Sequence, residues 1–244
     1  MRELQRWVER PRACSYLPER SAQLENRVLL DVTPAELDEL LARGVRRFGP
    51  MYFRPACAGC SACVSLRLRA DDFELRRRHR RVLARNHDLR VSVRSPKVDQ
   101  ARLDLYERWH VSRQDARGWE PSPLDGSSYA QVFAFPHESA IELSYWLGDR
   151  LVGVALSDAT PSALSAVYFY YDPQLTDRSL GTLNVLVHLL RAKQPGRTWV
   201  YLGYWVEACA SLRYKATFGP HEALDGEPSF DDDGEWRPRP GQAL

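Results

Sequence analysis

Leu164-Ser165-Ala166-Val167-Tyr168-Phe169-Tyr170-Tyr171 leads, after a short loop, into Arg178-Ser179-Leu180-Gly181-Thr182. The first stretch is mostly apolar and aromatic, which is typical of a buried strand. Leucine and valine then recur at helical spacing from residue 183 to residue 190, which predicts a helix. The loop between them therefore lies at a helix N-terminus, where backbone N–H groups and Arg178 can bind an anion such as a phosphate. The alternative is that this loop only caps the helix and binds no anion.

Further strands are predicted on both sides of this stretch. Residues 141–147 and 151–157 predict two strands joined by the turn Gly148-Asp149. Residues 198–204 predict a fourth strand, and residues 207–215 predict the start of another helix. The order hairpin, strand, loop, helix, strand, helix resembles the core of the GCN5-related N-acyltransferase fold. We therefore expect an α+β (or α/β) fold with an acyltransferase-like mixed sheet flanked by helices.

The first half of the chain shows clear local signals and a cysteine-bearing loop. Thr33, Pro34 and Glu36 form the capping box of a helix that Gly44 ends. Residues 1–32 show no clear periodicity. Beyond residue 44 we predict strands at residues 64–69 and 89–94, helices at 73–86 and 99–113, and a loop at 114–128. We expect two regions, a cysteine-containing N-terminal region at residues 1–72 and an acyltransferase-like region at residues 73–244.

Three of the five cysteines, Cys57, Cys60 and Cys63, follow the spacing C-x2-C-x2-C. Two-residue gaps let thiolates converge on one metal ion, and Cys14 is the candidate for the fourth ligand. Zinc and an iron–sulfur cluster both suit this ligand set, and buried free thiols without a metal are the alternative. An odd number of cysteines argues against a disulfide framework. We therefore expect a cytoplasmic protein with reduced thiols.

Composition and charge are typical of a globular protein with an uneven charge distribution. Hydrophobic residues make up 44% and charged residues 27% of the 244 residues, which is typical of a globular chain. We find neither an apolar run of the roughly 18 residues that a membrane span needs nor a signal-peptide core. The formal net charge is only +2. One dense basic run nevertheless predicts contact with RNA phosphates. It consists of Arg76, Arg77, Arg78, His79, Arg80 and Arg81. The alternative is a helix face that is only exposed to solvent.

Aromatic and charged residues near the strand ends are candidate catalytic groups. Tyr168 and Asp172 lie at the end of one strand, Tyr204 ends the next, and Lys215 follows. Asp172 can hold or deprotonate an amine, with a turn role before Pro173 as the alternative. Lys215 can neutralise an anion, and core packing is the alternative for the tyrosines. We interpret the lone histidines His110 and His188 as structural residues.

Several motifs stand in a characteristic order along nearly the whole chain. They are Cys14-Ser15-Tyr16-Leu17-Pro18, Tyr52-Phe53-Arg54-Pro55-Ala56-Cys57, Arg85-Asn86-His87-Asp88-Leu89, the stretch from Leu164 to Pro173, Arg178-Ser179-Leu180-Gly181-Thr182, Tyr201-Leu202-Gly203-Tyr204-Trp205 and Arg213-Tyr214-Lys215. Together they resemble the aminoacyl-tRNA–protein transferases of the arginyltransferase type, in particular the bacterial aspartate/glutamate leucyltransferases. The arginine block at residues 76–81 departs from the Ser-Arg-Ser-Gln-Arg-Arg run usual in this family.

The resemblance implies an enzyme that transfers an amino acid from aminoacyl-tRNA to the α-amine of proteins with N-terminal Asp or Glu, marking them for N-degron degradation. Leucine is the favoured donor amino acid, and arginine is the second candidate. The transfer itself requires no cofactor, while zinc or an iron–sulfur cluster is expected on Cys14, Cys57, Cys60 and Cys63. We expect a monomer without a membrane partner.

Roles at the reaction centre follow from this reaction. Catalytic roles fall to Tyr168, Asp172 and Tyr204. We expect substrate or tRNA binding from Arg54, Arg76, Arg77, Arg80, Arg81, Arg178, Ser179, Gly181, Thr182 and Lys215.

Two other functions fit part of the sequence. A CoA-dependent N-acetyltransferase requires the loop Arg/Gln-x-x-Gly-x-Gly/Ala, which residues 178–183 supply only in part. A metal-stabilised RNA-binding protein without catalysis accounts for residues 57–94, but it leaves the aromatic loops of the second half without a role.

Overall fold

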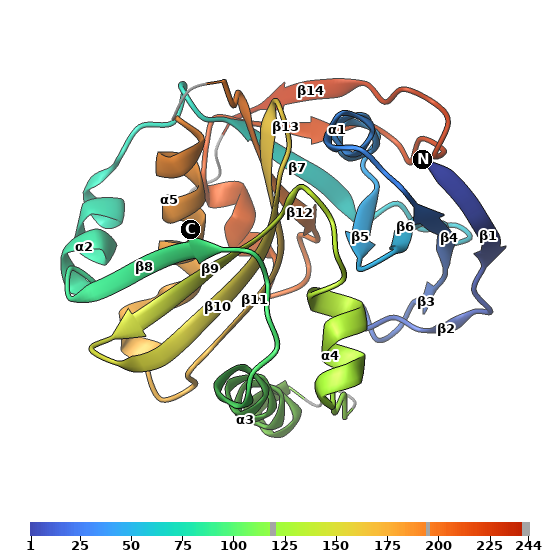
Figure 1. Cartoon of the computed structure of the whole chain (residues 1–244). Coiled ribbons are helices and arrows are strands. Elements are labelled where there is room, and N and C mark those ends of the chain that lie inside the picture. The colour runs from blue at the N-terminus through green and yellow to red at the C-terminus, as the bar shows by residue number, and fades with distance from the viewer. Residues whose placement is uncertain (118–120, 194–195, 241–244) are drawn as a thin grey trace.

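The computed structural model describes residues 1–117, 121–193 and 196–240. An antiparallel four-stranded sheet, in the order β1-β4-β6-β5, forms the N-terminal part (Figure 1). Its strands are β1 (Arg2–Val8), β4 (Leu24–Leu30), β5 (Arg46–Phe48) and β6 (Met51–Pro55). A short ribbon of β2 (Arg12–Ala13) and β3 (Ser21–Ala22) extends from this sheet.

The second sheet has eight strands in the order β14-β13-β7-β12-β11-β10-β9-β8. β11 and β12 are parallel, and the other neighbours are antiparallel. This confirms the predicted mixed sheet flanked by helices. The strands are β7 (Val64–Arg69), β8 (Leu89–Arg94), β9 (Ala140–Leu147), β10 (Arg150–Ala159), β11 (Ala163–Tyr171), β12 (Trp199–Trp205), β13 (His221–Leu224) and β14 (Trp236–Arg239).

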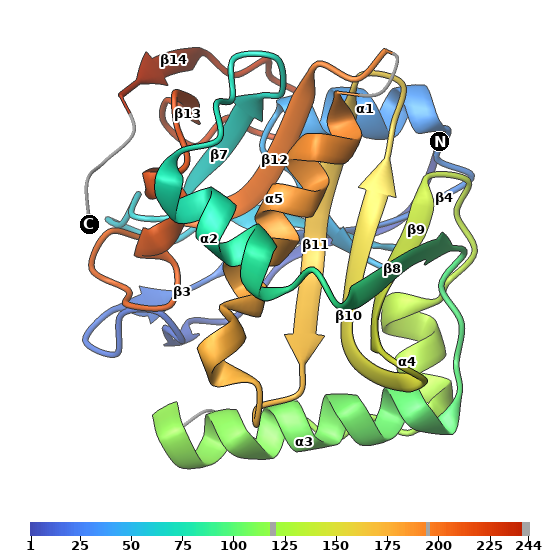
Figure 2. The same cartoon turned by 90° about the vertical axis from the view of Figure 1, so that its left-hand side faces the viewer.

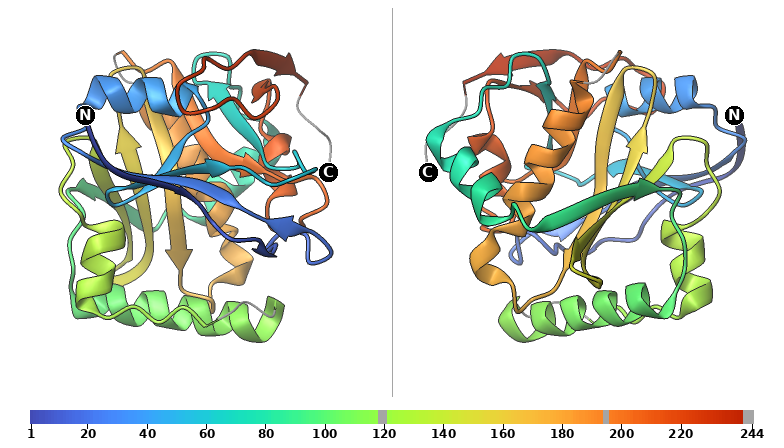
Figure 3. Two further views of the ribbon diagram at one scale, coloured as in Figure 1. Left: turned by 90° about the vertical axis from the view of Figure 1, so that its right-hand side faces the viewer. Right: turned by 60° about the vertical axis from the view of Figure 1, so that its left-hand side comes forward.

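Helices cover the large sheet on both faces. α5 (Leu180–Ala192) and α2 (Arg77–Arg85) lie on one face, and α3 (Gln100–Arg117) runs along one end beside α4 (Gly126–Phe133) (Figure 2). The small sheet and α1 (Pro34–Ala42) lie on the opposite face (Figure 3). Short 3-10 turns are η1 (Thr176–Arg178) and η2 (Arg213–Thr217). Within the described ranges, no helix is both long and apolar enough to cross a membrane.

The parallel pair β11–β12 opens toward its C-terminal end. Pairing covers the first three residues of each strand, from Ala163 opposite Trp199 to Ser165 opposite Tyr201. Both strands continue for several residues beyond this point, and β12 changes register against β7 at Gly203. Gly203 has a φ of 71°, a left-handed conformation that favours glycine. The two strand ends therefore separate, and we call this gap in the pairing between β11 and β12 the opening.

Local signals predicted several elements correctly. The capping box of α1 is present, since the Thr33 side chain accepts from the Glu36 amide and the Glu36 carboxylate accepts from the Thr33 amide. β7 through β12 and α5 also match the predicted elements closely. Two further predictions were too long or wrong: α2 begins only at residue 77, and residues 207–215 form turns and η2 instead of an α-helix.

The predicted loop at residues 114–128 was wrong at both ends, with residues 118–120 outside the described ranges. α3 continues to residue 117, and α4 begins at residue 126 because Asp125 caps it by accepting from the Ser128 amide at 2.7 Å. The prediction also missed β1 and β4 within residues 1–32. β4 buries polar residues, so its sequence lacks the apolar pattern of a buried strand. The carboxylate of its Glu25 forms an ion pair with Arg54 from β6 at 2.7 Å.

The proposed boundary at residue 72 stays a prediction. β7 lies before this boundary, yet it pairs with β12 and β13 inside the large sheet.

Candidate active site

Tyr168 and His110 form one wall of the opening. Tyr168 extends from β11, and its hydroxyl lies 2.8 Å from Nε2 of His110 on α3. Its ring stacks on Phe133 and meets Phe48 edge-on, with centroids 5.1 and 6.1 Å away. Burial raises the pKa of Tyr168 and lowers that of His110, so both groups are neutral near pH 7. His110 thus has a structural contact of the kind that we expected, and this contact holds the hydroxyl group of Tyr168.

Tyr204, Gly203 and Lys215 form the opposite wall. The Tyr204 hydroxyl donates to the Gly44 carbonyl at 3.3 Å, and Lys215 Nζ from η2 donates to the Tyr204 carbonyl at 2.8 Å. A Cβ placed on Gly203 would lie 3.7 Å from Lys215 Nζ. Burial, together with the positive charge of Arg46, lowers the pKa of Lys215 to about 7. The structure thus places Lys215 at the end of β12, and its predicted role of neutralising an anion stays a prediction.

Arg46 from β5 is a second buried cation at this wall. It is 7% exposed, and its Nε would lie 4.0 Å from a Cβ on Gly203. Its Nη1 donates to the Val45 carbonyl at 3.0 Å. Among the described residues, neither its Nε nor its Nη2 has a hydrogen-bond partner. No pattern in the sequence distinguishes Arg46 from Arg47 beside it, and only the fold does so.

Tyr16 lies near both walls. It belongs to the loop between β2 and β3, and its phenol adds to the raised pKa values of Tyr168 and Tyr204, which come mainly from burial. The pKa of Tyr16 itself is raised to about 12, first by burial and then by the neighbouring Cys63, Cys209 and Cys14. The N-terminal ribbon therefore reaches the opening of the large sheet. Nothing in the sequence of this loop predicted the contact.

Asp172 lies apart from these groups. Its carboxylate accepts from Arg150 at 2.8 Å and from the Gln174 amide at 2.9 Å. It borders a shallow pocket beside α3, together with Arg108 and Ser112. This is the turn role that the sequence offered as the alternative to catalysis.

The N-terminus of α5 lies on the α2 side of the sheet. Ser179 adopts a left-handed conformation with φ 54° and leaves the first amides of α5 without a side-chain cap among the described residues. The ring hydroxyl of Tyr214 would lie 3.9 Å from a Cβ on Gly181. Thr182 follows within the same first turn. Uncapped amides at a helix N-terminus attract negative charge, and the anion site predicted here stays a prediction.

The loop that leads into α5 is held by the segment after α2. Asp88 accepts a bidentate pair from Arg178 at 2.7 and 3.0 Å, and Asn86 Nδ2 donates to the Arg178 carbonyl at 2.8 Å. Arg85 donates to the Asp177 carbonyl. Arg178 is therefore neutralised by Asp88 and positions the loop, where the sequence predicted that it contacts a phosphate.

The predicted basic run divides into two sets. Arg78 points inward and donates to the Thr217 carbonyl. The outward set is exposed on the surface of α2 and consists of Arg76, Arg77, Arg80 and Arg81. Arg54, by contrast, lies in the small sheet and pairs with Glu25 at 2.7 Å. The exposed set fits the predicted phosphate contacts, while Arg54 serves the packing of the N-terminal part.

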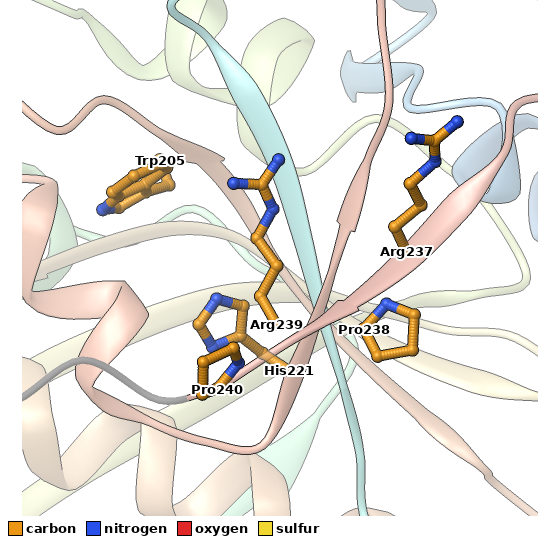
Figure 4. A pocket seen from close by; sticks show the side chains of 6 residues that line it. All are labelled: Trp205, His221, Arg237, Pro238, Arg239 and Pro240. Carbon is orange, nitrogen blue, oxygen red and sulfur yellow. The ribbon is translucent and has the colours of Figure 1, made fainter.

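A pocket of about 400 Å³ lies where β12 ends against the sheet edge (Figure 4). Trp205 points into it from β12, and the Nε1 atom of this tryptophan is buried without a hydrogen-bond partner among the described residues. His221 from β13 and Arg239 from β14 lie across from the indole. Because successive residues of a strand face opposite sides, this pocket lies across β12 from Tyr204.

The four cysteines of the predicted metal site are half-buried free thiols. Cys57 Sγ accepts from the Gln23 amide at 3.4 Å. Burial raises the pKa of Cys63 to about 12, with further contributions from negative charge on Cys14, Cys57 and Cys60. Within the described part of the chain, no three His, Cys, Asp or Glu side chains are grouped to hold a metal ion. Thiolates are nevertheless the ligands that zinc and iron–sulfur clusters prefer, and the metal site stays a prediction.

Comparisons with known proteins identify relatives of this chain. Aspartate/glutamate leucyltransferases of Helicobacter hepaticus and Aeromonas salmonicida are 37% and 39% identical to this chain, over 89% and 86% of its length and 90% and 88% of theirs. FemX, a solved structure 11% identical in sequence, matches with a TM-score of 0.43 over 75% of this chain and 63% of its own.

Family models account for most of the sequence. The arginine-tRNA-protein transferase N-terminus matches residues 12–81, and the C-terminus of the same family matches residues 101–225. The chain belongs to the arginine-tRNA-protein transferase family.

Proposed function

We propose that this protein transfers an amino acid from aminoacyl-tRNA to the α-amine of proteins that begin with Asp or Glu. Leucine is the favoured donor amino acid and arginine the second candidate, because the relatives described above are named leucyltransferases. The observation that carries the proposal is the opening between β11 and β12, where Tyr168, Tyr204 and Lys215 surround a site next to a helix N-terminus. The modified protein then enters the N-degron pathway.

The reaction requires the enzyme to position the two substrates more than to activate them. The ester that joins the amino acid to the tRNA ribose is already reactive, so ATP and a covalent enzyme intermediate are unnecessary. The acceptor α-amine attacks the ester carbonyl, a new amide bond forms, the ester C–O bond breaks, and the ribose hydroxyl leaves with a proton. In the tautomer in which His110 Nε2 donates to the Tyr168 hydroxyl, Tyr168 can donate its own proton in a hydrogen bond to the oxyanion that develops. Tyr204 and Lys215 border the acceptor side.

The tRNA is held from the α2 side of the sheet. Guanidinium groups on α2 contact phosphates of the acceptor arm, and the α5 N-terminus receives a phosphate near the 3′ end. The pocket beside Trp205, with Arg239 at its rim, suits an unstacked base of the same strand. Arg178 supports this site through its pair with Asp88.

The cysteines support the N-terminal part instead of the reaction. Cys14 and Cys63 lie beside Tyr16, so an ion bound to the four thiolates would fix the loop that reaches the opening. Such an ion, zinc or an iron–sulfur cluster, would supply structural crosslinking only. Metal analysis of the purified protein tests this: the proposal expects close to one zinc, or iron with sulfide, per chain, lost in a Cys57→Ser variant. Free thiols suit a reducing cytoplasm, where we expect the protein to act as a monomer.

Donor and acceptor can be tested together. Radiolabelled Leu-tRNA and Arg-tRNA are offered separately with peptides that begin with Asp, Glu or Arg. We expect label from Leu-tRNA on the Asp and Glu peptides. Label that appears only on the Arg-starting peptide would contradict the acceptor assignment, and label from Arg-tRNA alone would reverse the order of the donors.

A further inference from the structure

Arg46, Arg47 and Arg102 are buried, and in each of them Nε and Nη2 form one edge of the guanidinium group. Among the described residues, this edge has a carboxylate on it in Arg47 and Arg102 but not in Arg46. Arg47 uses Nε and Nη2 to hold Asp158, and Arg102 uses Nε and Nη2 to hold Glu142. Arg46 is as buried as Arg47, at 7% exposed each. Its Nε and Nη2 are the two atoms without a partner among the described residues. The free edge of Arg46 therefore has the geometry that binds a carboxylate side-on elsewhere in the same molecule.

The position of Arg46 puts this free edge next to the reaction site. Its Nε borders Gly203 on β12, where the strand turns away from β11, and Lys215 Nζ borders the same glycine. The rings of Tyr201 and Tyr204 flank the guanidinium, with centroids 5.3 and 5.8 Å away. A buried and a half-buried cation side by side are costly unless an anion joins them. Asp158, which contributes some negative charge, is already held by Arg47.

We infer that Arg46, with Lys215 beside it, binds the side-chain carboxylate of the acceptor's N-terminal Asp or Glu and so selects acidic N-termini. This inference rests on the proposed function and assigns its specificity to one residue. Gly203 leaves room for the acceptor because a side chain there would stand against both cations. The α-amine of the acceptor residue then lies between β12 and Tyr168 of β11, where the ester is presented.

A carboxylate suits this place better than a tRNA phosphate. Arg46 is buried beside two aromatic rings, and the planar fork of a guanidinium group matches the geometry of a small planar carboxylate. Phosphates of a long polyanion instead require exposed cations, which α2 provides with Arg77 and Arg80 on its surface. If Arg46 were purely structural, its ring contacts and its hydrogen bond to the Val45 carbonyl would account for its position, but they would not explain why Nε and Nη2 are left unpaired.

Matched acceptors test the inference. Peptides that begin with Asp and Asn differ by the charge of one group, and their kcat/KM values are compared for the wild-type protein, Arg46→Gln and Arg46→Lys. A site built around a charged partner discriminates by about two orders of magnitude or more. We expect a strong wild-type preference for Asp, a ratio close to one in Arg46→Gln, and a partial preference in Arg46→Lys. Thermal unfolding and Leu-tRNA binding confirm that each variant is folded.

The control is Arg69→Gln. Arg69 also stacks on an aromatic ring, Trp199, in the same sheet but away from the opening. We expect this variant to keep the wild-type Asp/Asn ratio. A wild-type ratio retained in Arg46→Gln would overturn the inference while leaving the proposed function intact. If the wild-type protein transfers nothing to either peptide, the proposed function fails, and calorimetric binding of the Asp and Asn peptides to the same variants still decides the role of Arg46.

Discussion

At the scale of residues, the site depends on charges that the fold leaves without partners. Lys215 and Arg46 lie together beside Gly203, and each makes a hydrogen bond to a backbone carbonyl. Two neighbouring residues, Arg46 and Arg47, therefore differ in role: Arg47 pairs with Asp158, whereas Nε and Nη2 of Arg46 are buried without a hydrogen-bond partner among the described residues. Such a difference depends on contacts between distant elements, and no pattern in the sequence records it.

The acidic-terminus preference should depend on pH through Lys215. Its pKa is lowered to about 7, so it is charged at about pH 6 and neutral at about pH 9, whereas an acceptor Asp side chain is ionised throughout this range. The Asp/Asn ratio of kcat/KM should therefore fall as the pH rises, while the shared α-amine titration cancels in the ratio. Lys215→Arg keeps its charge and should flatten the profile. A wild-type ratio that rises with pH would be the opposite of the expected sign.

Gly203 offers a second test with a matched glycine. Gly203→Ala and Gly148→Ala both place a side chain at positive φ, 71° and 58°, and should each destabilise the fold by about 1–2 kcal/mol. A Cβ at Gly148 meets nothing within 4 Å, whereas one at Gly203 approaches Lys215 and Arg46. We expect a lower kcat/KM for Asp peptides only in Gly203→Ala. Equal transfer by both variants, measured beside urea unfolding, would show that the space at Gly203 is not used.

At the scale of elements, α2 is both a surface for RNA and a support for α5. Its inward side chains bind η2 and the loop before α5, through Arg78 and Arg85, which leaves the opposite side exposed. The motif Arg85-Asn86-His87-Asp88-Leu89 thereby acquires a physical role. Asn86 and Asp88 hold Arg178 and so orient the first turn of α5.

The exposed arginines of α2 should control the salt dependence of tRNA binding. Replacing Arg77 by Gln removes one phosphate contact, so the slope of log K against log salt concentration should become shallower by about 0.7–0.9. Arg2→Gln, on the small sheet, removes an equally exposed arginine and should leave the slope unchanged. Titrations at several salt concentrations measure both. Identical slopes for the two variants would place the tRNA elsewhere.

The elements that could be predicted are those with local signals. The capping box at Thr33, the apolar run of β11 and the leucines of α5 needed no distant partner. β4 was missed because it buries Glu25, Asn26 and Arg27, and Arg27 is satisfied by Asp231 from the far end of the chain at 2.8 Å. The same holds for the site. Tyr168, Tyr204 and Lys215 are found from their place at strand ends, whereas Arg46, His110 and Tyr16 reach the opening only through tertiary packing.

At the scale of the whole molecule, the two halves build one site. The N-terminal sheet supplies Arg46 and the loop of Tyr16, and β7 lies between β12 and β13 of the large sheet. A chain restricted to residues 73–244 lacks this internal strand, and the neighbouring edges of β12 and β13 lose their hydrogen-bond partners. We expect it to lack cooperative thermal unfolding, which the full chain should show by circular dichroism. A sharp transition in the shortened chain would support residue 72 as a true domain boundary.

The central claim is that the opening between β11 and β12 joins an amino acid from tRNA to an acidic N-terminus. It is tested most directly by tandem mass spectrometry of an Asp-starting peptide after incubation with the protein and either Leu-tRNA or acetyl-CoA. The account predicts one added leucine on the α-amine with Leu-tRNA, no addition with acetyl-CoA, and no product from an N-acetylated peptide. An acetylated peptide, or an unmodified peptide in the presence of bound Leu-tRNA, would contradict it.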